Sequence, residues 1–106
     1  MESEYKLKAT PAAENDLDGI YSYISDTLHA PIASQNLRAK IKERFLSLCD
    51  NPYQCELCRN EILARKGYRR AVVDNYLGLY LVDEEKKWVI VARVFYGAMD
   101  YEKHLL

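Results

Sequence analysis

The chain has no apolar run near the ~20 residues that a membrane-spanning helix needs. Its N-terminus, MESEYKLK, also lacks the apolar core of a signal peptide. We therefore expect a cytoplasmic protein without a membrane partner. The cysteines agree, because Cys49, Cys55 and Cys58 are an odd number without the spacing of a disulfide framework, as is typical where thiols stay reduced.

Several catalytic signatures are missing too: the sequence has no glycine-rich phosphate loop, no HExxH pair and no nucleophile elbow. Cys55-x2-Cys58, with Cys49 nearby, resembles half of a zinc site. Tetrahedral zinc needs further ligands, and the two histidines, His29 and His104, lie far away in the sequence. We predict no metal and no cofactor.

The composition is that of a globular chain, with 49% hydrophobic and 29% charged residues among 106. No repeat or linker divides it, so we predict a single domain over residues 1–106. The net charge of −1 is unevenly spread, because residues 31–70 hold nine Lys or Arg against four carboxylates. This segment is a candidate basic face or an ordinary solvated helix surface. The pI of about 6.1 argues against a general nucleic-acid coat.

The N-terminal half predicts a strand followed by two helices. Alternation over Tyr5–Ala9 indicates a half-buried strand, and Thr10-Pro11 is typical of a helix start. Apolar residues then recur at helical spacing as far as Leu28, and a second such stripe lies between Pro31 and Asp50. The short link between them favours an antiparallel pair. Gly19 costs the first helix some stability and would permit the close approach of another element.

The C-terminal half predicts an irregular loop over residues 53–66, with one helical turn at Glu61–Arg65, and then three strands. These strands are expected near Tyr68–Val73, Tyr76–Val82 and Trp88–Phe95, with a short helical piece near Tyr101–Leu105. Asp74-Asn75 is short enough to force a hairpin. The run Val89–Ala92 is apolar on both faces, which favours a central strand. The fold class is therefore α+β, in the order β-α-α-β-β-β, with a helical pair packed on a small curved antiparallel sheet.

Arginines in these strands are candidates for binding an anion. Arg69 and Arg70 are neighbours, so their side chains point to opposite faces of the sheet. If Arg70 shares the face of Val72 and points outward, it could form with Arg93 a pair that grips phosphate or carboxylate groups. The alternative is that each arginine pairs with a carboxylate of its own chain.

The same block is rich in tyrosine: Tyr68, Tyr76, Tyr80, Tyr96 and Tyr101. Aromatic rings beside arginines suit stacking on unpaired bases, and they suit the packing of a partner peptide equally well. Tyrosine also simply fills the half-buried surface of a sheet. We take Arg69, together with Tyr68, Tyr76 and Tyr80, as the predicted partner-binding set.

The order of these pieces resembles the RelE/ParE superfamily, the toxins of bacterial type II toxin–antitoxin pairs, over nearly the whole chain. The matching segments are T-P-A-A-E at Thr10–Glu14, L-x-x-I-x-x-Y-I at Leu17–Ile24, N-P-Y at Asn51–Tyr53, Y-R-R at Tyr68–Arg70, then N-Y-L-x-L-Y, D-E-E-K-K, V-I-V-A-R-V and D-Y-E-K-H-L. No single segment is specific, whereas their order and spacing are.

The resemblance implies a growth-inhibiting toxin of the kind associated with plasmid stabilisation. It also implies a hetero-oligomer with a RelB- or ParD-like antitoxin, which wraps the toxin with a helix and an extended segment. RelE-like members cut messenger RNA on the ribosome, and ParE-like members inhibit DNA gyrase. If this chain is an endoribonuclease, its catalytic candidates are Arg70, Arg93, Tyr96 and Tyr101.

The chain departs from the pattern of the cutting members at three places. Leu77 stands where their middle strand carries arginine, Phe95 precedes Tyr96 where a subset has histidine, and Ala98 follows Gly97 where arginine is common. RNA cleavage needs activation of a hydroxyl and charge stabilisation at phosphorus. We therefore favour a gyrase inhibitor without catalysis of its own, with the endoribonuclease as the alternative. A non-toxic interaction module that keeps only the fold is the third reading.

Overall fold

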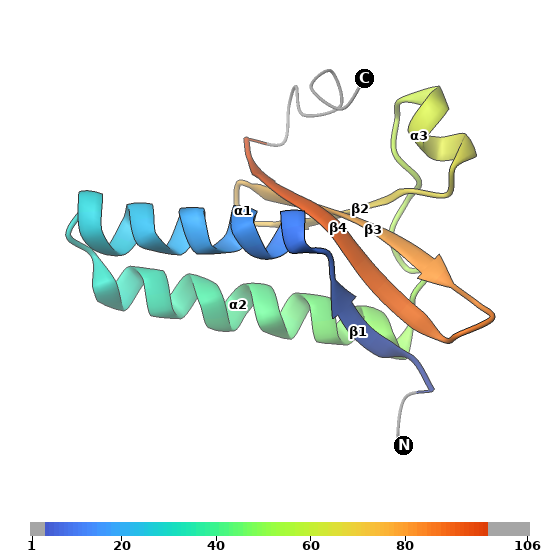
Figure 1. The fold of residues 1–106 in the computed structure, drawn as a ribbon, viewed down its shortest axis with the longest axis horizontal. Coiled ribbons are helices and arrows are strands. Elements are labelled where there is room, and N and C mark those ends of the chain that lie inside the picture. The colour runs from blue at the N-terminus through green and yellow to red at the C-terminus, as the bar shows by residue number, and fades with distance from the viewer. Residues whose placement is uncertain (1–3, 98–106) are drawn as a thin grey trace.

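A computed structural model of the chain describes residues 4–97. A pair of long helices lies against a four-stranded sheet and extends beyond it, with the link between the helices at the far tip (Figure 1). The elements are β1 (Lys6–Ala9), α1 (Pro11–Ser22), the π-helix η1 (Tyr23–Thr27), α2 (Pro31–Asp50), α3 (Glu61–Arg65), β2 (Arg69–Val73), β3 (Tyr76–Asp83) and β4 (Trp88–Tyr96). The predicted α+β class and element order are confirmed. The expected helical piece at Tyr101–Leu105 lies outside the described residues.

The start of α1 is fixed by Thr10, as the sequence predicts. Its Oγ1 accepts a hydrogen bond from the Ala13 N–H at 3.1 Å and donates one to the Ala92 carbonyl at 2.7 Å. The cap therefore also ties the helix to β4. The far end of this helix differs from the prediction, because the α-helix stops at Ser22 and continues as η1.

The sheet has the strand order β1-β4-β3-β2. β4 pairs antiparallel with β3, and β3 with β2, but β1 runs parallel to β4. The sheet is thus mixed, where the sequence suggested an antiparallel one. β4 lies between two strands, which confirms the central position predicted from Val89–Ala92. The hairpin at Asp74-Asn75 is also confirmed, with Asp74 at a φ of +53°.

Both faces of the sheet bury apolar residues. The larger core joins the helices to the sheet through buried residues that include Ile41, Phe45, Leu48, Tyr80, Val89 and Val91. The smaller core joins Cys58 and Leu63 to Leu77 and Leu79 of β3, with Tyr68 and Phe95 packed against it. Leu77 is therefore a core residue. No helix within residues 4–97 combines the length and apolarity needed to cross a bilayer.

Candidate functional site

A groove of about 800 Å³ lies between the first helix and the end of the sheet. One wall consists of residues from α1, η1 and the link that follows: Asn15, Asp16, Gly19, Ile20, Tyr23, Ile24 and Leu28. The other wall is formed by Tyr76, Val94, Phe95 and Tyr96. Figure 1 shows α1 running beside the end of β4, which places the two walls next to each other. We call this feature the α1–β4 groove.

Large apolar side chains of the groove are exposed to solvent. Tyr96 is 70% exposed, Tyr23 56% and Leu28 53%. The Tyr96 ring packs edge-to-face against Tyr76, with 5.2 Å between the ring centroids. Soluble chains rarely leave such residues together on a surface without a partner. The groove is therefore a candidate protein-binding site.

Gly19 lies in the middle of α1 and faces open space. A Cβ placed on it would meet no other heavy atom within 4 Å, apart from its chain neighbours and the backbone of its own helix. The close approach that the sequence suggested for Gly19 is thus made by no described part of this chain. An external segment could approach the helix backbone at this point.

The apolar stripe that predicts the first helix is covered by the sheet only at its beginning. Ala13 is fully buried, Ile20 and Ile24 are half-buried, and Leu28 is exposed. Within η1 the Leu28 N–H bonds to the Tyr23 carbonyl at 3.0 Å, and just before it the Ser34 hydroxyl donates to the Tyr21 carbonyl at 2.9 Å. π-helical turns are rare and often occur at functional sites. Here the turn lies in the groove wall.

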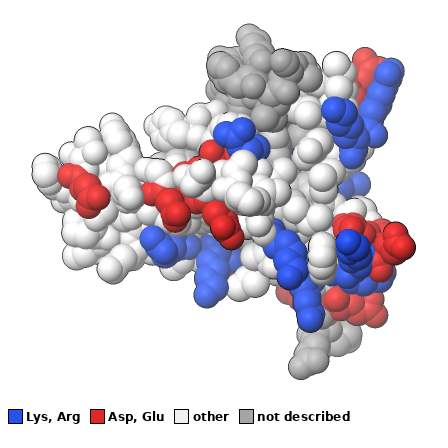
Figure 2. Space-filling model, in the orientation of Figure 1, with Lys and Arg blue, Asp and Glu red and all other residues white. Residues whose placement is uncertain are grey.

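The exposed surface of the first helix and η1 is acidic. α1 and η1 carry the exposed carboxylates of Glu14, Asp18 and Asp26. On the face drawn in Figure 2, Asp and Glu side chains follow the first helix, whereas Lys and Arg follow the neighbouring α2. Asp18 and Asp26 line a separate hollow with Arg38, and the carboxylate of the groove lining, Asp16, is paired with Arg93.

Arg93 is engaged by its own chain, which is the alternative that the sequence left open. Its Nε donates to Asp16 at 2.7 Å and one terminal nitrogen donates to the other carboxylate oxygen at 3.1 Å. The same carboxylate accepts the Val94 N–H at 3.0 Å, so it also satisfies the edge of β4. Hydrogen bonding to Asp16 raises the pKa of Arg93. The guanidinium is committed to Asp16, a residue of the groove wall.

Arg70 and Arg93 lie in one cross-strand row, because both are paired in register with Leu79. Two strand spacings, roughly 10 Å, separate their backbones. Arg70 is half-buried at the edge strand β2 and lies in a shallow hollow with Arg44 and Glu56. The two arginines share a sheet face, but Arg93 turns toward α1 and the expected pair does not form.

Arg69 lies near the loop that follows α2. One of its terminal nitrogens donates to the Cys55 carbonyl at 2.6 Å, and its guanidinium lies 5.0 Å from the centre of the Tyr53 ring. Arg69 shares its strand face with Ala71 and Val73, because the three residues occupy alternate positions of β2. Ala71 and Val73 are buried, which agrees with the prediction that Arg69 points to the helix side or the sheet edge.

The tyrosines of the predicted partner-binding set separate into different environments. Tyr76 and Tyr96 line the groove, and Tyr68 packs half-buried against the smaller core. The assignment of Tyr80 to a partner surface is wrong, because it is fully buried and its hydroxyl donates to the Pro52 carbonyl at 2.7 Å. Its face of β3 is the one that the helices cover. Tyr101 lies outside the described residues.

All three cysteines are buried, and no disulfide bond joins them. Cys49 and Cys55 belong to the larger core and Cys58 to the smaller one. Within residues 4–97, no three His, Cys, Asp or Glu side chains come together in a way that could hold a metal ion.

At the other end of the sheet, a group of hydrogen-bonding side chains surrounds one carboxylate. Sequence reasoning missed this group. Glu84, in the β3–β4 turn, accepts hydrogen bonds from the hydroxyls of Tyr5 and Tyr53 and pairs with Lys87 at 2.9 Å. These hydrogen bonds lower the pKa of Glu84 to about 2 and raise that of Tyr53 to about 12. The three segments lie far apart in sequence, so only the tertiary structure brings them together.

The chain matches the family model of the ParE toxin of type II toxin–antitoxin systems, parDE, over residues 7–101. Among solved structures it is similar to a chain of the chromosomal ParDE toxin–antitoxin system from P. aeruginosa. That match has a TM-score of 0.71 and 22% identity, and it covers 88% of this chain and 96% of the other. A chain of the RelBE2 toxin–antitoxin complex from Mycobacterium tuberculosis has a TM-score of 0.62 and 23% identity, with coverage of 87% and 96%. No curated protein matches the chain.

The helical pair on a small mixed sheet is thus the fold of RelE/ParE toxins. The family-model match extends over almost the whole chain. The chain belongs to the ParE toxin family of type II toxin–antitoxin systems, which confirms the resemblance read from the sequence.

Proposed function

We propose that the α1–β4 groove binds a cognate ParD- or RelB-like antitoxin and that this binding neutralises a growth-inhibiting toxin. The observation that carries the proposal is Gly19, which leaves the helix backbone open beside exposed Tyr23, Leu28 and Tyr96. Apolar residues at Ile20 and Ile24 provide a wall suited to an amphipathic helix.

The target that we propose is DNA gyrase, reached in the cytoplasm and inhibited without catalysis by this chain. Two features support this choice over mRNA cleavage. Arg93 is held by Asp16 rather than free for phosphate. Leu77, which stands where the cutting relatives are expected to carry arginine, is fully buried in the smaller core. Tyr96 is exposed and Arg70 half-buried, so the endoribonuclease is the second candidate.

A substitution at Gly19 tests the antitoxin site. Gly19→Leu places a side chain in the groove and favours the helix by about 0.8 kcal/mol, so toxicity and folding should persist. The antitoxin encoded by a short reading frame beside the gene, when co-expressed, should restore growth to cells that express the wild-type toxin. It should not restore growth to cells that express Gly19→Leu. Ala12→Leu is the matched control, because Ala12 is an exposed α1 residue outside the groove. Equal neutralisation of both variants would contradict the proposed site.

The target is tested separately with the purified chain. We expect inhibition of DNA supercoiling by gyrase and intact mRNA in induced cells. If the mapped transcripts have 5′ ends at fixed codon positions and supercoiling is unaffected, the target is the ribosome and not gyrase. Normal growth after induction in every host would favour an interaction module without toxicity.

A further inference from the structure

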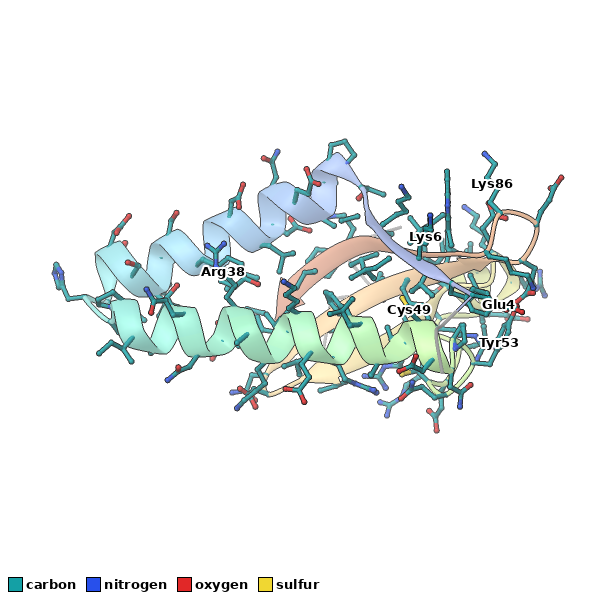
Figure 3. All side chains as sticks on the ribbon, turned by 90° about the horizontal axis from the view of Figure 1, so that it is seen from below. Glu4, Lys6, Arg38, Cys49, Tyr53 and Lys86 are labelled. Carbon is teal, nitrogen blue, oxygen red and sulfur yellow. The ribbon has the colours of Figure 1, made fainter. Side chains whose placement is uncertain are left out.

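A cluster of lysines surrounds Trp88 at the end of the sheet remote from the tip of the helical pair. The ammonium groups of Lys8 and Lys86 lie 5.0 Å and 4.9 Å from the centre of the Trp88 ring. Lys6 is exposed and stands directly opposite Trp88 in the β1–β4 register. Figure 3 shows Lys6 and Lys86 at this end of the molecule. We call these four residues the Lys–Trp site.

The site lies on the sheet face away from the helices. Leu7 packs against the larger core, so the alternating residues Lys6 and Lys8 point to the opposite face. Lys86 reaches the same ring from the β3–β4 turn. Half-buried Ile90, the register partner of Lys8, extends the surface with an apolar patch. The side chains thus combine three cations, one indole and the half-buried side chain of Ile90.

Carboxylates lie near these lysines in the sequence, since exposed Glu4 precedes Lys6 by two residues and exposed Glu85 directly precedes Lys86. Within residues 4–97, no ion pair joins Lys6, Lys8 or Lys86 to a carboxylate. Two acidic residues of the neighbouring turn are engaged elsewhere, and exposed Glu85 is a third. Glu84 is held by tyrosine hydroxyls and Lys87, and Asp83 accepts the backbone N–H of Lys86 at 3.0 Å. Each of the ammonium groups of Lys8 and Lys86 is within the distance of a favourable cation–π interaction with the ring.

We propose that the Lys–Trp site binds single-stranded nucleic acid, with the lysines on phosphates and Trp88 beside a base. A ring flanked by cations on an open strand surface is the arrangement by which sheets bind unpaired strands. An acidic peptide would use the lysines but would leave the indole and Ile90 without a matching group. The site is separate from the α1–β4 groove and does not depend on the identity of the antitoxin or the target.

Trp88 itself reports on binding, because it is the only tryptophan of the chain. Titration of the full chain with a short oligothymidylate at low salt should change its fluorescence in a saturable way. The apparent affinity should fall steeply as salt is added, since each lysine–phosphate contact releases counterions.

Charge removal tests the lysines. Lys8→Gln combined with Lys86→Gln should weaken binding roughly tenfold and flatten the salt dependence. Lys42→Gln, which removes an exposed cation from α2, is the matched control and should bind like the wild type. Circular dichroism of each variant separates loss of binding from loss of folding.

Three results would overturn the proposal. The first is an unchanged Trp88 spectrum throughout the titration, and the second is equal binding by the double variant and Lys42→Gln. The third is polyglutamate binding as tightly as the oligonucleotide, which would assign the site to acidic peptides. Trp88→Leu, followed by anisotropy of a labelled oligothymidylate, should lose affinity if the ring contributes to binding.

Discussion

Two glycines, Gly78 and Gly19, occupy regular elements for opposite reasons. At Gly78 a Cβ would come within 2.8 Å of the Phe45 ring, so the absence of a side chain lets α2 pack on β3. At Gly19 a Cβ would meet nothing within 4 Å. Glycine weakens a helix or strand interior in both cases. The fold of the described chain accounts for this cost at Gly78 only, and the open position at Gly19 is the observation behind the proposed antitoxin site in the α1–β4 groove.

The largest expected effect is at Gly78. Gly78→Ala should lower the free energy of unfolding by about 1–3 kcal/mol, because the added methyl group overlaps a buried ring. Urea denaturation measures the change. In a Phe45→Leu background the penalty should shrink, since the clashing ring is gone. An identical loss in both backgrounds would show that contact with Phe45 is not the cause.

An intermediate effect is expected at Asp16, in the wall of the groove. Asp16→Asn should cost about 1–2 kcal/mol, because the charged hydrogen bonds to Arg93 are lost while an acceptor for the Val94 N–H remains. Thermal or urea unfolding can measure it. Asp18→Asn, an exposed substitution on the same helix, should change stability by less than about 0.5 kcal/mol. Similar losses for both would mean that the Asp16–Arg93 pair contributes little.

The smallest effect is at Gly19. Gly19→Ala should raise the free energy of unfolding by about 0.5–1 kcal/mol, because alanine is the better helix former and no contact opposes its methyl group. The sign is opposite to that at Gly78, so the pair of substitutions tests the comparison directly. Destabilisation by Gly19→Ala would show that the groove wall is filled in the free protein.

Local rules predicted much of the fold. Thr10-Pro11 started α1, Pro31 and Asp50 bounded α2, the helical turn at Glu61–Arg65 formed as expected, and Asp74-Asn75 made the hairpin. In each case the signal is a cap, a breaker or a period within a few residues. The π-helix escaped prediction, since the apolar spacing through Ile24 and Leu28 fits an ordinary α-helix.

The candidate sites were predicted less well, because their chemistry depends on distant partners. Asp16 and Arg93 are 77 residues apart, and no periodicity links them. Tyr80 was assigned to the partner-binding set, but the sequence did not show that the helices cover its face of β3. The Lys–Trp site combines β1, a turn and β4, three segments that meet only in the sheet.

The sequence lacks a long apolar run, a disulfide framework and a catalytic signature, and these absences narrowed the class of protein. The order of its segments determined its family. Secondary structure follows from short-range sterics and capping, which a sequence displays directly. Tertiary structure decided which arginine is neutralised, which tyrosine is buried and which glycine faces empty space. Those outcomes depend on desolvation and contact between residues far apart in the chain, so they arise only when the sheet and the helical pair have assembled.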